Sequence, residues 1–508
     1  MSDGGLVAEL ASRLVGIAIV SSDIGDDDIK GQNIESLTAY IRNHFGDGES
    51  PALLDRELLV KIKGEMQEPA PQIKVEIVRN SSFNPIAKEI TEDFVIRNAA
   101  AGKTSGSVPD FTAYFNDRLD RIKEIIYNGQ ANKAAGLMRD IESLKQYTSG
   151  REVVIAGMVY DKVITKNGHV LVTIDDETGT QKVLFMKPFG EGPNGAMSEL
   201  FAKALKIIND EVIAVRGKIS GPFVMANTLI YPDVPVHQMK KTEDDMAIAF
   251  TSDVHVGSKL FGEKQFGRFV DWMNGRYDYK KGLAERIKYI VVSGDLVDGI
   301  GVYPNQEREL AIDDIYKQYS EFFTLFSKIP EYVHIFILTG NHDAVQRAEP
   351  QPQLPNEFYK DFKLSNMHLV SNPGYVTLNG IRVLGYHGTS LDSIIQGIPG
   401  CSYSKPEGAM LEILKRRHLS PIYGDNPIVP LKSDSMVIDK VPDILHMGHL
   451  HKNGYAEYHG TLIVNSGTWQ ERTGFQVRMG HVPTPAILPV YEAKQGVMST
   501  VDFNGAFS

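Results

Sequence analysis

Five short clusters of Asp, Asn and His residues recur in the second half of the chain, each directly after a short apolar run. Carboxylate, amide and imidazole groups are all ligands for divalent cations. One such cluster alone is weak evidence, because a single histidine after a strand is usually a hydrogen-bonded structural residue. Five in succession indicate one shared site. The clusters are Asp253-Val254-His255, Gly294-Asp295-Leu296-Val297-Asp298, Gly340-Asn341-His342-Asp343, Tyr386-His387-Gly388 and Gly448-His449-Leu450-His451.

The apolar runs that precede the clusters have the length and composition of buried strands, as in MAIAF, YIVV and HIFIL. Helical stretches separate several of them, which predicts an α/β domain. Open α/β sheets bind their ligands at the carboxyl ends of the strands, where these clusters would lie. Within residues 461–508, TLIVNSG and AILPVYEA are further strands that could complete a second sheet.

Such a set of side chains suits two-metal hydrolysis of a phosphodiester. Two cations roughly 3.5–4 Å apart can hold both the attacking and the leaving oxygen. Such a pair needs a bridging ligand, and the two oxygens of the Asp295 carboxylate make it the candidate. The mixed set without thiolate favours Mn²⁺, Fe²⁺ or Zn²⁺ over an all-oxygen Mg²⁺ or Ca²⁺ site. We therefore expect two divalent metal ions, with manganese as first choice and iron or zinc as alternatives.

Upstream of this region the periodicity is that of a small β-barrel. Three strands, a helix and two strands, in that order, predict an OB-fold. Barrels of this type bind single strands or dock proteins, and the lack of an obvious aromatic ladder or basic groove favours docking. The expected elements are strands 152–160, 169–175 and 180–187, a helix at 196–209, and strands 211–219 and 223–231.

The N-terminal part divides into a helical domain and a tether. Helical spacing of apolar residues at Ile34–Phe45 and Leu53–Lys63 predicts a small helical domain. Residues 71–110 resemble a tether with one strand at 71–79, and a helix begins near Asp110. The predicted domains are 1–70 (helical), 71–150 (linker and helix), 151–240 (OB-fold) and 241–508 (the domain with the polar clusters).

Composition limits the possible partners and compartments. The 508 residues suggest about three domains. A net charge of −11 argues against tight DNA binding by the chain alone, because phosphate neutralisation needs a basic surface. Binding to DNA would then depend on a partner or on a local basic patch. The single cysteine, Cys401, excludes an intramolecular disulfide, and no signal peptide or membrane span is evident. We expect a soluble, cytoplasmic protein that does not bind membranes.

The motif set D-x-H, G-D-x-x-D, G-N-H-D, H and G-H-x-H resembles that of the calcineurin-like metallophosphoesterases. The intervening segments GDLVDGIGVYPNQE, LTGNHDAVQRAEPQPQLP and YHGTSLDSII resemble the small subunit of the archaeal family D DNA polymerase. The resemblance extends from about Pro71 to the end. It implies an OB-fold followed by a calcineurin-like α/β phosphoesterase sandwich at 241–508. It also implies a large polymerising partner subunit and 3′→5′ proofreading exonuclease activity on single-stranded or mismatched DNA 3′ ends.

The resemblance also assigns roles to individual residues. His342 would contact the scissile phosphate and protonate the leaving 3′ oxygen, while water activated by the metals attacks. Asp295 would bridge the two ions. The first ion would be held by Asp253, His255, Asp295 and His451, and the second by Asp295, Asn341, His387 and His449.

Two other functions remain open. One is a stand-alone metallophosphoesterase or repair nuclease, although a minimal small-molecule enzyme would not need the upstream domains. The other is a non-catalytic scaffold subunit of a polymerase, which the filled ligand positions argue against.

Several nearby residues have two possible roles each. Asp298 and Asp343 either orient neighbouring groups or cap loops, and His446 is expected to be structural. Arg347 either contacts a DNA phosphate or pairs with Glu349. The basic run 415–418 is expected to be a solvated helix face rather than a DNA contact.

Overall fold

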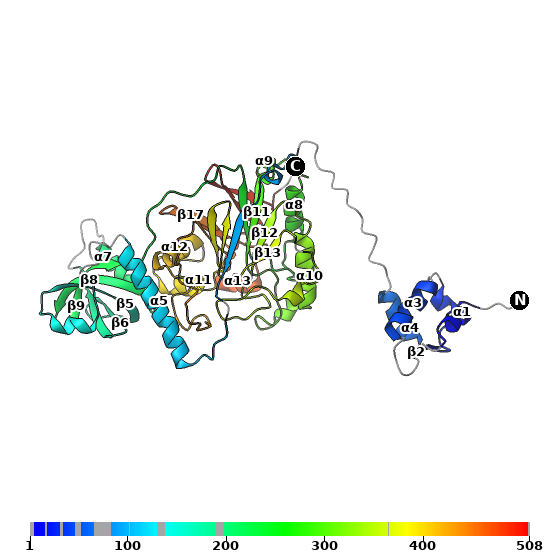
Figure 1. Ribbon diagram of the computed structural model, residues 1–508, viewed down its shortest axis with the longest axis horizontal. Helices are drawn as coiled ribbons and strands as arrows, with labels where there is room; N and C mark the ends of the chain where they lie inside the picture. The colour runs from blue at the N-terminus through cyan, green and yellow to red at the C-terminus, as the bar shows by residue number, and fades with distance from the viewer. Residues whose placement is uncertain are drawn as a thin grey trace. The chain divides into compact units, whose positions relative to one another are not determined.

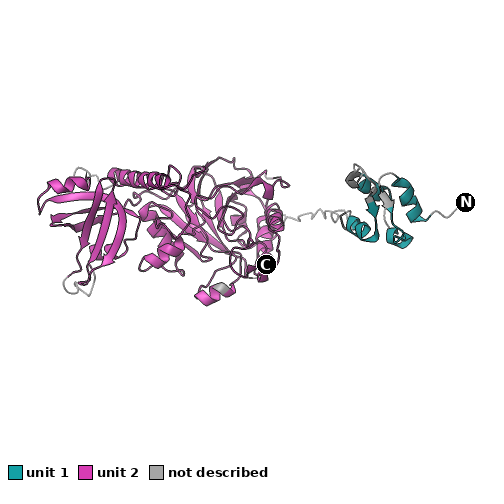
Figure 2. Cartoon of the chain, turned by 90° about the horizontal axis from the view of Figure 1, so that it is seen from below, with its two compact units in different colours: residues 1–78 teal, residues 79–508 magenta. Residues whose placement is uncertain are grey.

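The computed structural model describes residues 5–15, 18–30, 34–45, 52–65, 83–100, 102–129, 138–188, 198–363 and 365–505. The chain forms two compact units, residues 1–78 and residues 79–508, which are coloured separately in Figure 2. Within the described ranges, no helix is both long enough and apolar enough to cross a bilayer. The strand predicted at 71–79 lies outside the described residues.

The N-terminal unit is a small helical fold around one apolar cluster. The predicted helix at Ile34–Phe45 (α3) is confirmed. The second predicted helix is shorter at its start, because Leu53 and Leu54 belong to a strand that pairs in parallel with an earlier strand. Leu10, Leu37 and Leu59 are buried together in the core. The remaining elements are α1 (Leu6–Arg13), β1 (Ala18–Val20), α2 (Asp26–Ile29), β2 (Ala52–Leu54) and α4 (Arg56–Glu65).

A closed five-stranded barrel forms the first part of the second unit. The strands pair in the order β5-β6-β7-β9-β8, and β8 pairs back onto β5 to close the ring. Alternate residues such as Val170, Val172 and Ile174 point into its apolar interior. All five predicted strands are confirmed. The elements are β4 (Met138–Arg139), η2 (Glu142–Gln146), β5 (Glu152–Ile164), β6 (Val170–Asp176), β7 (Gly179–Phe185), α7 (Glu199–Leu205), β8 (Val212–Ser220) and β9 (Phe223–Ile230).

Two six-stranded mixed sheets form the C-terminal body. The first has the order β13-β12-β11-β10-β19-β20, and the second has the order β17-β18-β16-β15-β14-β3. The first comprises β10 (Ala247–Thr251), β11 (Ile287–Ser293), β12 (His334–Leu338), β13 (Met367–Leu369), β19 (Ile487–Glu492) and β20 (Val497–Asp502). The second comprises β3 (Phe94–Asn98), β14 (Gly374–Leu378), β15 (Ile381–Gly385), β16 (Ile444–Met447), β17 (Asn453–Tyr458) and β18 (Thr461–Ser466).

The sheets and helices of this body are arranged in layers, as Figure 1 shows. Apolar residues of the two sheets, including Ile248, Val291 and Val383, form one shared core. Helices α8 and α10 cover the outer face of the first sheet, and α11 and α12 cover that of the second. The coarse prediction of a barrel followed by an α/β body is thus confirmed. The helices are α8 (Glu263–Met273), α9 (Lys281–Ala284), α10 (Ile315–Phe326), α11 (Leu391–Gly397), α12 (Pro406–Arg416) and α13 (Gly474–Met479), with the short 3₁₀ turns η1 (Ile86–Lys88), η4 (Gln306–Arg308) and η5 (Asn356–Phe358).

Two predictions about the edges of this body are wrong. Residues 83–100 are not a tether, because β3 pairs along its whole length with β14 and Ala87 donates a backbone hydrogen bond to Glu285. The predicted strands TLIVNSG and AILPVYEA do not lie in the same sheet. AILPVYEA forms β19 and pairs with β10 in the first sheet, whereas TLIVNS forms β18 in the second. Sheet membership depends on pairings between segments far apart in sequence, which strand propensity does not encode.

The basic run 415–418 is also not a solvated helix face. Arg416, Arg417 and His418 are buried, so neither the solvated nor the DNA-contact interpretation holds for them. Arg416 pairs with Glu412 and with Glu211 beside the barrel strand β8. His418 Nε2 lies 2.8 Å from the buried carboxylate of Asp434. The Arg416–Glu211 pair therefore joins the barrel to the C-terminal body.

Helix α5 (Val108–Asn128) completes this junction and runs between the barrel and the body in Figure 1. Its Arg118 Nε donates to Asp434 at 2.8 Å, and its Tyr114 hydroxyl donates to the same carboxylate at 2.8 Å. Arg118 is only 2% exposed. Buried charges of this kind are costly unless every partner is in place.

Substitution of Asp434 by asparagine should destabilise the second unit by about 3–5 kcal/mol, because it leaves the buried Arg118 guanidinium without a counter-charge. Urea denaturation followed by circular dichroism would measure this loss. The matched control is Glu152→Gln, which breaks the exposed Glu152–Arg216 pair on the barrel and should cost less than about 1 kcal/mol. Equal losses for the two variants would contradict the role assigned to Asp434.

Candidate metal centre

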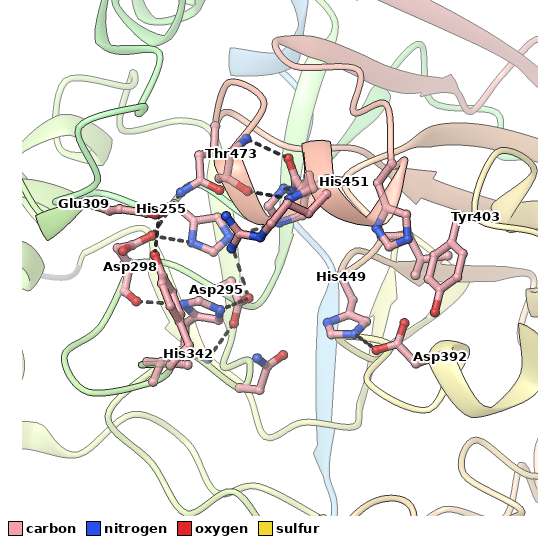
Figure 3. A pocket seen from close by; sticks show the side chains of 18 of the residues that line it. His255, Asp295, Asp298, Glu309, His342, Asp392, Tyr403, His449, His451 and Thr473 are labelled. Carbon is pink, nitrogen blue, oxygen red and sulfur yellow. Dashed lines mark hydrogen bonds and ion pairs between the residues drawn. The ribbon is translucent and has the colours of Figure 1, made fainter. Parts of the chain in front are cut away.

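The five polar clusters predicted from the sequence converge at one edge of the two sheets. Each follows the carboxyl end of a strand, namely β10, β11, β12, β15 or β16. A cavity of about 610 Å³ opens onto this edge and is lined by His255, Asp295, Asn341, His342 and other residues. Figure 3 shows His255, Asp298, Asp295 and His342 on one side of it, and His449, Asp392 and Tyr403 on the other.

The backbone at these positions is strained in a consistent way. Residues Asp253, His255, Asp295, His449 and His451 all have φ between 49° and 68°. Such left-handed conformations are uncommon for residues other than glycine and cost roughly 1–3 kcal/mol each when sparsely populated. They cluster at sites where the structure must aim a side chain. Four of these residues, His255, Asp295, His449 and His451, line the cavity beyond the strand ends.

Glycines in the motifs allow the side chains to approach closely. A Cβ on Gly340 would lie 2.3 Å from Asp295 Oδ1 and 2.5 Å from the Asp295 backbone nitrogen. A Cβ on Gly448 would lie 2.2 Å from Asp253 Oδ2. A Cβ on Gly294 would lie 2.6 Å from His387 Nδ1, and its φ is +84°. Because they lack a Cβ, Gly294, Gly340 and Gly448 therefore leave space for polar side chains that belong to other motifs.

Substitution of Gly340 by alanine should displace the Asp295 carboxylate and lower the melting temperature. The destabilisation should be about 1–3 kcal/mol, as for other overpacked sites, and Mn²⁺ affinity should fall with it. Thermal denaturation and titration calorimetry would measure the two effects. Gly408→Ala on α12 is the control, since its Cβ would meet nothing within 4 Å. If both variants bind Mn²⁺ like the parent protein, the close approach at Gly340 is not needed.

One group of ligand atoms comes from Asp253, His255 and His451. These atoms all lie within 4.8 Å of one another. His451 Nε2 is 3.3 Å from Asp253 Oδ1 and 3.1 Å from His255 Nε2. Donors about 2.1 Å from one ion stand about 3 Å apart, so this spacing suits a shared cation. All three residues are buried.

A second group comes from Asp295 and His387, with Asn341 beside them. His387 Nε2 lies 3.3 Å from Asp295 Oδ2 and 2.9 Å from Asn341 Oδ1. Its Nδ1 donates to the Ser293 carbonyl at 2.8 Å, which directs Nε2 toward the two oxygens. Burial lowers the pKa of His387, but the Asp295 carboxylate outweighs this and raises it to about 10. A cation bound here would compete with that proton.

His342 stands beside both groups but is held differently. Its Nδ1 donates to the Asp298 carbonyl at 2.7 Å. The other ring nitrogen, Nε2, is therefore the one that faces the candidate ligand atoms, and it lies 4.0 Å from Asp295 Oδ2. Burial lowers the pKa of His342 against the opposing effect of Asp295. His342 also groups with His255 and Asp298 as a possible set of metal ligands. The geometry therefore permits either an acid–base role or a ligand role.

His449 is turned toward a residue that the sequence did not single out. Its Nε2 is 3.0 Å from Asp392 Oδ2, while its ring lies 5.2 Å from that of His387. Leu450, which lies between the two histidines, packs into the apolar cluster under α11 and α12. A ligand role for His449 stays a prediction.

The donor set suits divalent cations on chemical grounds. Asp253 and Asp295 are both buried, and among the described residues neither forms an ion pair with Lys or Arg. Neighbouring imidazoles hold the pKa of Asp295 well below its ordinary value despite its burial. Buried carboxylates of this kind need positive charge to balance them, which a bound cation can supply.

The neighbouring residues now have defined contacts. Asp298 Oδ1 lies 3.1 Å from His255 Nδ1, the arrangement that orients a metal-binding histidine. Asp343 accepts from the Tyr319 hydroxyl and the Gly340 nitrogen, and so holds a loop. His446 lies between Ser293 and Ser466 as a structural residue, as predicted. Arg347 donates to the Val302 carbonyl and not to Glu349, whose carboxylate is buried against Tyr386.

Sequence reasoning missed several polar residues that support the candidate ligands. Gln470 and Gln306 donate to the Asp298 carboxylate at 3.0 and 2.9 Å. Gln476 Nε2 lies 2.8 Å from His451 Nδ1. A glutamine carries no metal-site signal by itself. Only the fold brings these glutamines to the cluster.

Comparisons with known proteins place this architecture in a family. Residues 248–455 match the family of B-type subunits of DNA polymerases alpha and epsilon. The DNA polymerase II small subunit of Methanothermobacter thermautotrophicus is 37% identical over 92% of this chain and 96% of its own. That of Archaeoglobus fulgidus is 41% identical over 85% and 84%. That of Methanocaldococcus jannaschii is 40% identical over 81% and 69%. These similarities along most of both chains show that the chain belongs to the family of DNA polymerase II small subunits.

Proposed function

We propose that the chain is the 3′→5′ exonuclease subunit of a two-subunit DNA polymerase and hydrolyses phosphodiesters at DNA 3′ ends. The observation that supports this proposal is the convergence of the five motif clusters at the strand ends, beside one cavity. A scaffold subunit would have no reason to keep strained, buried carboxylates and imidazoles in this arrangement.

The proposed site would hold two divalent ions, and Mn²⁺ is our first choice. Asp253, His255, Asp295 and His451 would hold one, and Asp295, Asn341, His387 and His449 the other, with Asp295 between them. When bound, the ions supply a nucleophilic water at neutral pH and neutralise the phosphate charge. The mixed nitrogen and oxygen donor set favours Mn²⁺, Fe²⁺ or Zn²⁺ over Mg²⁺.

The protein's own groups would then position the DNA and move the proton. His342 donates from Nδ1 to the Asp298 carbonyl, so Nε2 is its free nitrogen toward the scissile phosphate. A neighbouring phosphate would favour protonation of Nε2, and this proton would pass to the leaving 3′ oxygen. Asp298 and Gln476 would keep His255 and His451 in the orientation that the ligands require.

At the level of architecture, we propose that the closed barrel is an OB-fold and that the C-terminal body is a calcineurin-like phosphoesterase sandwich. The domains would be 1–70, 151–240 and 241–508, as the sequence suggested, while β3 of the segment 71–150 would belong with the last of them, because it pairs with β14. The relatives are named small subunits, so we propose a large catalytic polymerase subunit as the partner. With a net charge of −11, the chain would rely on that partner for most of its hold on DNA.

Purified protein supplied with Mn²⁺ should shorten a 5′-labelled oligodeoxynucleotide from its 3′ end, faster at a mismatched or single-stranded end than at a paired one. A chelator should stop the reaction, and added Mn²⁺ should restore it. A tagged chain expressed in its native host should retain a much larger partner. Absence of cleavage both alone and with that partner would contradict the exonuclease proposal.

A further inference from the structure

The cavity at the metal centre has an aromatic wall that the proposed chemistry does not use. Tyr403 and His481 both line it, and their rings stack with centroids 4.1 Å apart and an interplanar angle of 28°. In Figure 3, Tyr403 lies on the His449 side, across the cavity from His342. The two residues come from separate loops, one between α11 and α12 and the other directly after α13.

This wall is joined to the metal centre through Asp392. The Asp392 carboxylate accepts from His449 Nε2 at 3.0 Å and also neighbours Tyr403. Burial, followed by this carboxylate, raises the pKa of Tyr403, so that the side chain remains a neutral phenol. The ring is therefore fixed close to the proposed ligands and is available as an uncharged stacking surface.

Beside this aromatic wall, the rim of the cavity carries a cationic side chain, the second feature of sites that bind single strands. Arg478 of α13 lines the same cavity, is exposed, and has no ion-pair partner among the residues whose placement is described. Its neighbours Val477 and Met479 are large exposed apolar residues. Aromatic rings for bases and a cation for the backbone are the combination that proteins use to hold single strands without reading their sequence.

We propose that the Tyr403–His481 pair is the stacking platform for the base of the 3′-terminal nucleotide. The inference rests on the proposed exonuclease function. If the leaving 3′ oxygen lies at His342, the rest of the strand leaves on that side, and the terminal nucleoside extends toward the opposite wall. A base placed there would extend the existing stack of two rings. A cavity of about 610 Å³ is within the usual range for small-molecule sites and has room for one nucleotide.

The competing explanation is that the two rings only pack α13 onto the body. The two explanations differ in one measurable respect. A platform makes cleavage and binding depend on the presence of a base, whereas a packing contact does not. Stacking that acts through face-to-face contact should also tolerate all four bases at the 3′ end.

The experiment uses the full chain with Mn²⁺ and two oligodeoxynucleotides that differ only at the 3′ end, one with a normal residue and one with an abasic tetrahydrofuran. The parent protein should cleave the normal end about tenfold more efficiently, in line with the usual value of one base–aromatic stack. Tyr403→Leu and His481→Ala should reduce this ratio to about one. Tyr403→Phe should keep it, as should the control Tyr455→Leu, which removes an exposed tyrosine on β17 outside the cavity.

A second readout is independent of cleavage. Calorimetry with deoxyadenosine 5′-monophosphate and with 2-deoxyribose 5-phosphate should show the same base-dependent ratio and the same loss in the two variants. Affinity for Mn²⁺, measured by calorimetry in the absence of nucleotide, reports on the metal centre alone and should be unchanged in them. A parent protein that does not distinguish base from abasic ligands, or variants that still do, would overturn the platform but leave the exonuclease proposal intact. Lack of DNA cleavage would overturn the exonuclease proposal, while the binding ratio would still decide the platform.

Discussion

Replacement of His342 by alanine should lower the rate of DNA 3′-end cleavage by roughly 10²–10⁴-fold, the usual contribution of a general acid. The Nδ1 of His342 is held by the Asp298 carbonyl at 2.7 Å, which leaves Nε2 to act on the substrate. Since alanine cannot carry a proton, the leaving 3′ oxygen would depart unprotonated. Single-turnover cleavage of a 5′-labelled oligodeoxynucleotide with saturating Mn²⁺ would measure the loss.

The metal content of this variant separates the two roles that the geometry permits. If His342 is the acid, His342→Ala should bind Mn²⁺ as the parent protein does. If it is a ligand together with His255 and Asp298, affinity for Mn²⁺ should fall along with activity. His237→Ala, a change outside the cavity lining, serves as the control. Undiminished cleavage by His342→Ala would exclude both roles.

Substitution of Asp295 by asparagine should abolish both Mn²⁺ binding and cleavage. The Asp295 carboxylate lies 3.3 Å from His387 Nε2 and 3.8 Å from His255 Nε2, between the two ligand groups. An amide has one good acceptor oxygen and no charge, so it cannot bridge two cations in place of the carboxylate. At Mn²⁺ concentrations near 100 times the dissociation constant, the parent protein should gain about 2.7 kcal/mol of stability, and Asp295→Asn should gain none.

Thermal denaturation with and without Mn²⁺ would measure this difference directly. The matched control is Asp271→Asn, which removes an exposed carboxylate paired with Arg276 and should leave the Mn²⁺ response unchanged. If Asp295→Asn is still stabilised by Mn²⁺ as strongly as the control, Asp295 does not bridge the ions. Any activity it retained would then have to come from a different ligand arrangement.

The sequence itself determined the local features of the site. Short buried strands followed by Asp, Asn or His are visible as apolar runs and polar clusters, and the carboxyl ends of parallel strands must lie at one edge. The five barrel strands were visible for the same reason, because their period and turn residues are local properties.

Only the tertiary structure decided what depends on contacts between distant segments. The buried Arg416 and His418 look like a solvated basic run in the sequence, because their burial depends on partners, Glu211 and Asp434, that the local pattern does not identify. Asp392, Gln470 and Gln476 carry no motif and reach the ligands only through folding. Long-range packing likewise sets the pairing of β3 with β14 and the stack of Tyr403 on His481. Local periodicity does not indicate either contact.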